Sequence, residues 1–169
     1  EEHGGTVNAL WESIEENAFV DCFKLIMIIN KSNLDIAAGS SNHGGVALYA
    51  LEVLSEDNNK ITYVDDYLFY IDEKAYLVGY KGEEETIILP DIGQNYEIYN
   101  YAFHNCDTIK YVEFNSSITA LGVGAFKNCD MLKEINIPYY IIRIGEEAFY
   151  SCTNLSKFSF DENCTISTI

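Results

Sequence analysis

Basic residues are scarce in this sequence. It has 10 lysines and arginines against 27 aspartates and glutamates, which gives a formal net charge of −17 over 169 residues. Such a charge repels the phosphate backbone of nucleic acids and the anionic surface of membranes. Nineteen of the 27 acidic residues lie within residues 1–97, so the later half has the more neutral surface. The charge balance argues against nucleic-acid and membrane-surface partners.

Long apolar runs are also missing. The longest one near the start is "FKLIMII" (residues 23–29), and Lys24 interrupts it. A membrane-spanning helix needs about 20 apolar residues in a row. No charged and then apolar leader opens the chain. We therefore expect no membrane insertion of this chain, which is either cytosolic or secreted with its leader absent from this sequence.

The five cysteines contain no C-x-x-C pair, which is the usual spacing of zinc ligands. Four of them recur after an Ala-Phe dipeptide and are expected to be buried thiols, with an occasional disulfide as the alternative. These are Cys22, Cys106, Cys129 and Cys152. Cys164 lies outside this pattern. The spacing predicts no metal site and no cofactor.

Catalytic motifs are absent as well. The histidines His3, His43 and His104 belong to no nucleophile elbow and no zinc-protease helix. The acidic stretches Asp65-Asp66 and 83–85 lack the alternating ligand spacing of a calcium loop. They are read as solvated turns, and we predict no catalytic residue and no enzymatic activity.

The sequence does contain an internal repeat of 23 residues. Phe103, Phe126 and Phe149 are each 23 residues apart, and each has Ala before it and Cys three residues after it. Further apolar residues recur six, nine and eleven residues after each Phe. In a repeat protein each unit buries its apolar side chains against the units on either side, so the same residue sizes return. The repeat predicts a solenoid with a column of Phe side chains in its core.

Two stretches indicate the content of one coil. "KEINIP" (133–138) alternates polar and apolar residues, which predicts a short strand with Ile135 and Ile137 inward. "GEEAFYSC" (145–152) has acids ahead of its Ala-Phe pair, which predicts a single helical turn on the opposite edge. Strands on one face and helical turns on the other predict an α/β solenoid of horseshoe shape.

The first half is less regular. "SIEENAFVDCFKLIMI" (13–28) carries the same register, but Phe19 lies 84 residues before Phe103, which is not a multiple of 23. The stretch 63–90 alternates around the polar turns "DEK" and "GEEE" and predicts a three-stranded β-meander.

We therefore expect one domain over residues 1–169. It has a first coil at 13–30, irregular or hairpin coils at 31–97 and regular coils at 98–169. A separate small domain within 31–97 is the alternative. No polar capping unit is evident at either end, which favours a longer array or self-association through uncapped ends.

The pattern I-x-x-x-A-F-x-x-C-x-x-L-x-x-I-x-I-P resembles the leucine-rich repeats of the BspA-like family of bacterial cell-surface and secreted proteins. The hairpin segment "YLFYIDEKAYLVGY" (67–80) also resembles coils that interrupt those arrays. The resemblance implies a horseshoe fold, an extracellular or cell-surface location, and adhesion or binding to host proteins, other cells or matrix. It implies no enzyme, because the shared residues are core residues.

If the strands line the concave face, their outward side chains form mixed aromatic and polar rows, which are typical of recognition surfaces. The predicted ligand-binding residues are Tyr111, Glu113, Asn115, Glu134, Asn136, Lys157, Ser159 and Asp161. An ordinary solvated sheet face is the alternative. The predicted function is protein binding or adhesion by a non-enzymatic module. A carbohydrate-binding module that uses exposed tyrosines and an architectural spacer are the other two hypotheses.

Overall fold

The computed structural model describes residues 14–56 and 59–166. The chain divides into two units, Glu1–Asn58 and Asn59–Ile169. Within the described residues, the only helix is the short 3-10 turn η1 (His43–Gly45), and every other regular element is a strand. That turn is far too short and polar to cross a membrane, and the described residues contain no other candidate.

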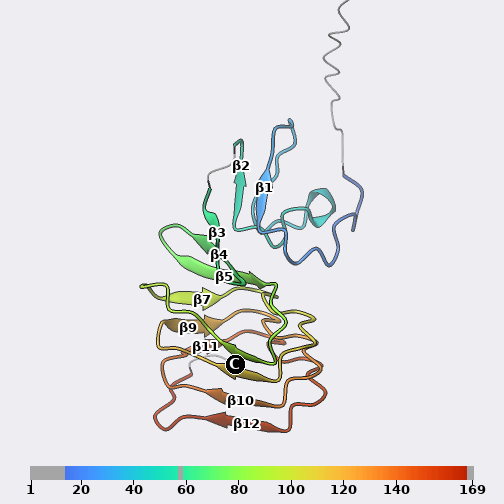
Figure 1. The fold of residues 1–169 in the computed structure, drawn as a ribbon. Helices are drawn as coiled ribbons and strands as arrows, with labels where there is room; N and C mark the ends of the chain where they lie inside the picture. Colours follow the sequence, from blue (N-terminus) through green and yellow to red (C-terminus); the bar gives the residue numbers. More distant parts are fainter. Residues whose placement is uncertain (1–13, 57–58, 167–169) are drawn as a thin grey trace, which may run out of the picture. The chain divides into compact units, whose positions relative to one another are not determined.

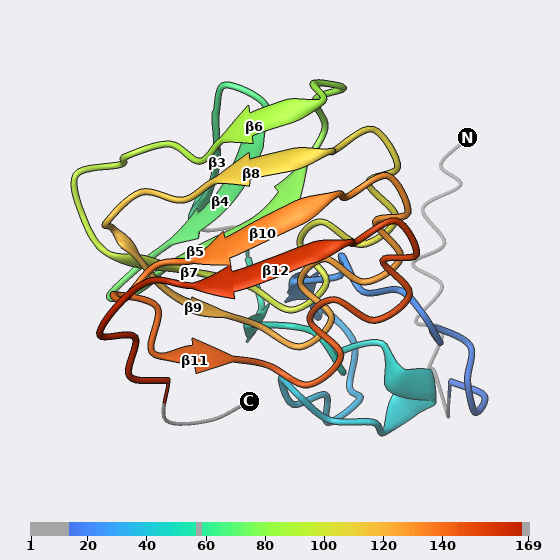
Figure 2. The same ribbon diagram turned by 90° about the horizontal axis from the view of Figure 1, so that it is seen from below.

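The second unit is a stack of coils built on two sheets (Figure 1). The four-stranded sheet is parallel, in the order β12-β10-β8-β6, and Figure 2 shows it face on with β6 at its edge. Its strands are β6 (Thr86–Ile88), β8 (Tyr111–Glu113), β10 (Glu134–Ile137) and β12 (Lys157–Phe160). On β10, Ile135 and Ile137 are buried while Asn136 is exposed, which confirms the predicted strand and its inward face.

The second sheet has six strands in the order β11-β9-β7-β5-β4-β3. Its parallel part is made by β5 (Ala75–Tyr80), β7 (Tyr96–Ile98), β9 (Ile118–Leu121) and β11 (Arg143–Ile144). Each regular coil therefore has two strands, one in each sheet, where the sequence predicted one strand and one helical turn. Hydrogen bonds of both sheets run from coil to coil, so each coil depends on its neighbours for its backbone partners.

The predicted helical turn at the Ala-Phe corner is wrong. A residue in the left-handed region flanks the pair on each side, at Tyr101 (φ 58°) and Asn105 (φ 60°), and two such residues interrupt any right-handed helix. The N–H of Phe103 donates to the carbonyl of Ala125 on the next coil at 2.9 Å, instead of to a carbonyl within its own turn. The corner is thus a third ladder between coils.

The expected horseshoe is not confirmed. A solenoid curves when one side is wider than the other, as when helices oppose strands. Here strands lie on both sides, and neighbouring strands are spaced about 4.8 Å apart in any sheet. In the described residues of the second unit, each regular coil thus lacks the helix opposite a strand that the predicted horseshoe relied on.

The Phe column is confirmed. The rings of Phe103 and Phe126 are parallel within 1°, and those of Phe126 and Phe149 within 4° at 5.6 Å. Phe103 and Phe126 have no exposed surface. Of the four cysteines predicted to be buried, Cys129 and Cys152 are buried, whereas Cys22 and Cys106 are only half-buried. The prediction of buried thiols is therefore confirmed at Cys129 and Cys152 and is wrong in degree at Cys22 and Cys106.

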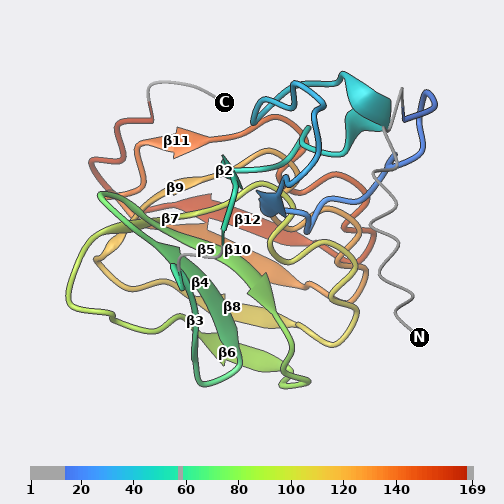
Figure 3. The same cartoon turned by 90° about the horizontal axis from the view of Figure 1, so that it is seen from above.

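The β-meander is confirmed, with different boundaries. Its strands β3 (Ile61–Val64), β4 (Tyr67–Ile71) and β5 (Ala75–Tyr80) pair antiparallel and lie side by side in Figure 3. The first turn is Asp65-Asp66, while "GEEE" leads out of the meander into β6. Because β6 buries Ile87 as β10 buries Ile135, it joins the four-stranded sheet.

The first unit contains two coils, of which the sequence indicated the first by its register and left the second among the irregular coils of 31–97. Strands β1 (Met27–Ile29) and β2 (Glu52–Leu54) pair parallel. The N–H of Phe19 donates to the carbonyl of Gly44 at 2.9 Å, as that of Phe103 donates to Ala125, so Gly44 takes the Ala position of a second corner. A Cβ at Gly44 would lie 2.5 Å from the carbonyl oxygen of Glu15. Glycine there hides the Ala-Phe signature. The continuity of the coils as one domain stays a prediction.

Candidate binding surface

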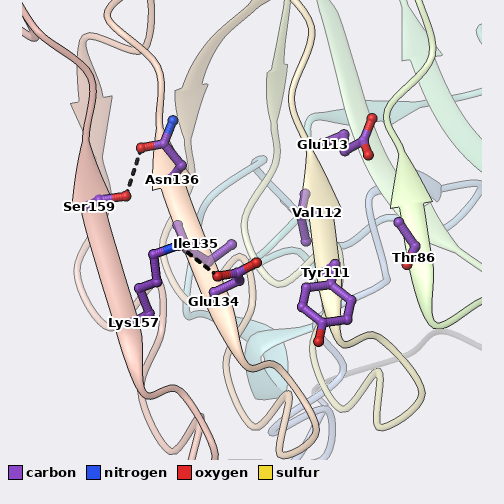
Figure 4. Close-up of a pocket in the computed structure, with 9 residues that line it drawn as sticks. All are labelled: Thr86, Tyr111, Val112, Glu113, Glu134, Ile135, Asn136, Lys157 and Ser159. Atoms are coloured by element: carbon purple, nitrogen blue, oxygen red, sulfur yellow. Dashed lines mark hydrogen bonds and ion pairs between the residues drawn. The ribbon is translucent and has the colours of Figure 1, made fainter.

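The outward face of the four-stranded sheet brings equivalent side chains of successive coils into rows. Thr86 pairs with Tyr111, Tyr111 with Glu134, and Glu134 with Lys157. Because these strands are parallel and in register, residues at the same repeat position lie beside one another on the same face. A pocket of about 360 Å³ lies on this face (Figure 4). Its lining residues are Thr86, Tyr111, Val112, Glu113, Glu134, Ile135, Asn136, Lys157 and Ser159.

Six of the eight predicted binding residues line this pocket. They are Tyr111, Glu113, Glu134, Asn136, Lys157 and Ser159. Asn115 does not: its Nδ2 donates to the carbonyl of Leu89 at 2.6 Å, and its Oδ1 accepts from the N–H of Ser117 at 2.8 Å. Asn115 therefore holds the turn after β8. Asp161 lies beyond the pocket, where its Oδ1 accepts a hydrogen bond from Asn136 Nδ2 at 2.6 Å.

The β10 and β12 side of the pocket is internally paired. Lys157 Nζ lies 3.0 Å from Glu134 Oε2, and Ser159 Oγ donates to Asn136 Oδ1 at 2.7 Å (Figure 4). These contacts pair the four side chains with one another across the two strands. On the β8 side, Tyr111 and the exposed Glu113 face the opening.

Two lysines stand near the β8 end of the pocket. Lys133 Nζ lies 5.8 Å from the centre of the Tyr111 ring. Lys110 forms an ion pair with Glu85. The hydrogen bond and charge of Lys110 lower the pKa of the Glu85 carboxyl, with a smaller contribution from Lys133. The acidic stretch before β6 is thus partly neutralised next to the pocket.

Three lining residues were not predicted: Thr86, Val112 and Ile135. Val112 and Ile135 belong to the inward set of the repeat, with Ile135 fully buried, so they form the floor of the pocket. Thr86 was missed because 63–90 was read as a meander. A signal was present, since "TIILP" (86–90) has the pattern of "EINIP" (134–138).

The most exposed tyrosines lie away from this pocket. Tyr63 is 56% exposed and Tyr150 is 56% exposed, and each has a lysine over its ring. Lys81 Nζ lies 4.2 Å from the centre of Tyr63, and Lys127 Nζ lies 5.0 Å from that of Tyr150. Tyr139 packs against Tyr140 edge to face, with 72° between the ring planes. None of these three tyrosines therefore forms part of a flat platform of coplanar aromatic rings.

Among the described residues, the two histidines lie in turns and contact residues of other turns and loops. His43 Nε2 lies 3.1 Å from the carbonyl oxygen of Asp35, and His104 Nε2 lies 3.4 Å from Asn128 Nδ2. His3 lies outside the described residues. In residues 14–56 and 59–166, no three His, Cys, Asp or Glu side chains converge in a way that could hold a metal ion.

Comparison with known proteins agrees with this architecture. The family model of the BspA type leucine rich repeat region matches residues 71–169, in 6 copies. A leucine-rich repeat protein of T. pallidum has a similar structure, with a TM-score of 0.53 and 24% identity over 57% of this chain and 48% of that one. This chain thus spans about half the length of that protein.

A second solved structure, a leucine-rich repeat protein of Bacteroides capillosus, has a TM-score of 0.45 and 20% identity over 61% of this chain and 99% of its own. No curated protein sequence matches the chain. The family match covers more than half of the chain, from the end of β4 onward. The chain belongs to the BspA-type leucine-rich repeat family.

Proposed function

We propose that this chain is a non-enzymatic, cell-surface or secreted module that binds a protein partner on the outward face of the four-stranded sheet. Leucine-rich repeats are generally a protein-interaction fold, and BspA-type repeats occur in bacterial surface and secreted proteins. The observation that carries the proposal is the meeting of six predicted residues around one pocket.

The pocket has the composition of a protein-binding surface. Tyr111 supplies an aromatic ring, and aromatic residues are enriched among the side chains that dominate binding energy. Around it stand a carboxylate, an amide, a hydroxyl and a Lys157–Glu134 ion pair, all on strands. Because Glu134, Asn136, Lys157 and Ser159 already contact one another, ordering them for a partner costs less side-chain entropy than ordering unpaired side chains would.

Carbohydrate binding is the second candidate, and the tyrosine contacts weigh against it. A sugar ring stacks on an open aromatic face. Lysines already occupy one face of Tyr63 and of Tyr150, and Tyr140 stands edge-on to Tyr139. Tyr139, which is 60% exposed, is the tyrosine that such a function would use.

A paired variant tests the proposal. Tyr111→Ala with Glu113→Ala removes the open side of the pocket and leaves the core intact. Asp107→Ala with Thr108→Ala is the matched control, since both residues are exposed in the loop before β8. The natural chain and both variants are screened against a panel of purified extracellular proteins and a glycan array.

We expect a protein ligand whose binding is lost in the Tyr111 and Glu113 variant and kept in the control. A glycan ligand that depends on Tyr139→Ala would support the carbohydrate function instead. Full tolerance of both variants, with no ligand on either panel, would leave the architectural spacer as the better description.

A further inference from the structure

Strand β6 leaves one edge of the four-stranded sheet open. In a parallel ladder, alternate residues direct both backbone groups to one neighbour. The N–H of Tyr111 bonds to the carbonyl of Glu85 and the N–H of Leu89 to that of Glu113, so the odd-numbered residues face β8. The backbone groups of Thr86 and Ile88 therefore point away from the sheet.

One of these groups has a partner that confirms the direction. The hydroxyl of Tyr67 donates to the carbonyl of Ile88 at 3.0 Å. Among the described residues, this is the one hydrogen bond seen on the open edge. The N–H of Ile88 and both backbone groups of Thr86 are left to pair with an added strand.

A pocket of about 250 Å³ adjoins this edge. Its lining combines carboxylates with two tyrosines and the edge strand itself. The residues are Asp65, Asp66, Tyr67, Tyr80, Glu84, Thr86, Ile87 and Ile88. The side chain of Ile88 is 65% exposed and offers an apolar contact to a neighbouring strand.

The charge beside the edge is negative. Asp65, Asp66 and Glu84 line this pocket together with Tyr67. Burial, with smaller contributions from these three carboxylates, raises the pKa of Tyr67 to about 12. Among the described residues, the cation that pairs with them is Lys81, 4.0 Å from Asp66, and Lys81 also lies over Tyr63. The three carboxylates therefore have one lysine among them as a counter-charge, and the net charge of this pocket is negative.

We propose that an extended peptide segment rich in lysine and arginine adds as a further strand to the open edge of β6. Thr86 and Ile88 supply the backbone hydrogen bonds, and Asp65, Asp66 and Glu84 bind the basic side chains. A second copy of this chain fits the edge poorly, because two such acidic edges repel each other. The inference goes beyond the proposed function, which concerns the outward face of the sheet and not its edge.

The test uses the whole chain and short synthetic peptides with a fluorescent label. The probe alternates valine and lysine. One control peptide replaces lysine by glutamate, and another carries N-methyl groups on alternate amides, which block strand pairing and keep the charge. Binding is measured by fluorescence anisotropy at low salt.

Matched protein variants separate the site from overall charge. Asp65→Asn, Asp66→Asn and Glu84→Gln remove the carboxylates, and asparagine suits position 65, which has a positive φ. Asp107→Asn, Glu146→Gln and Glu162→Gln remove the same charge from exposed positions outside the pocket. Exposed ion pairs contribute little each, so we expect roughly a two- to threefold loss of affinity per carboxylate.

The expected result is binding of the valine-lysine peptide, none of the glutamate or N-methylated peptide, and about a tenfold loss in the triple variant. Equal losses in the control protein, or equal binding of the N-methylated peptide, would overturn the proposal. Self-association of the chain at its β6 edge would overturn it too. The Tyr111→Ala, Glu113→Ala variant should bind the peptide normally, which keeps this test independent of the outward face.

Discussion

The cysteines of the repeat act as hydrogen-bond donors as well as small apolar side chains. Cys129 Sγ donates to the carbonyl of Phe103 at 3.1 Å, and Cys152 Sγ donates to that of Phe126 at 3.0 Å. Each thiol thus bonds to the preceding coil. Burial raises the pKa of both thiols, so they stay protonated and keep donating at neutral pH.

Buried thiols and phenols make the fold sensitive to alkali. The pKa of Cys129 is raised above 9.0 by burial, and that of Tyr67 is raised from 10.0 to about 12. Folding favours the neutral forms, so this stability is complete below pH 9.0 and falls as pH rises toward about 12. We expect the free energy of unfolding in urea to decline over that range.

Tyr67→Phe is the control for the alkaline decline, because it removes one of the titrating groups. It should flatten the fall above pH 10.0, even though the hydrogen bond to Ile88 is lost. An unfolding free energy that is independent of pH throughout this range would contradict the argument.

At the scale of the element, the 23-residue repeat predicted those features that depend on the position of a residue within the repeat. It located the Phe column, the inward face of β10 and six of the residues around the pocket. It missed the second strand of each coil and the corner conformation. Tyr101 and Glu147 adopt the left-handed backbone conformation although neither is glycine or asparagine, so their residue types do not predict it. Asn115 was misplaced because its amide turns back to Leu89.

The corner geometry makes a prediction at Gly124. This glycine has a φ of 57°, and an added Cβ would collide with the ring of Tyr101. Gly124→Ala therefore adds a steric conflict of about 1–3 kcal/mol to a left-handed strain of about 1–2 kcal/mol. Urea unfolding followed by circular dichroism measures the loss.

Gly93→Ala is the matched change in the same unit. Gly93 has a φ of 76° and nothing within 4 Å of an added Cβ, so it reports the backbone strain alone. We expect Gly124→Ala to lower the free energy of unfolding by clearly more than Gly93→Ala. Equal losses would mean that the Tyr101 ring moves aside without cost.

At the scale of the whole molecule, the excess negative charge makes stability depend on the salt concentration. The chain has 27 acidic and 10 basic residues, so most carboxylates repel one another instead of pairing with a cation. The surface ion pairs that do form each contribute little to stability. Salt screens the repulsion over about 10 Å at 0.1 M. We therefore expect the midpoint of thermal unfolding to rise by several degrees when sodium chloride is added to a low-salt buffer. A fall would show that attractive pairs dominate.

The thiol bonds between coils have a consequence for how such a protein changes its length. At two successive joints the Phe carbonyl of one coil accepts a hydrogen bond from the Cys thiol of the next, so removing one full period between them leaves the same contacts in place. A deletion of any other length would move the Phe side chains out of their column and leave the Cys thiols without a carbonyl partner. Genes for such chains can grow or shrink by whole coils, while smaller insertions are tolerated only in the loops outside the ladders.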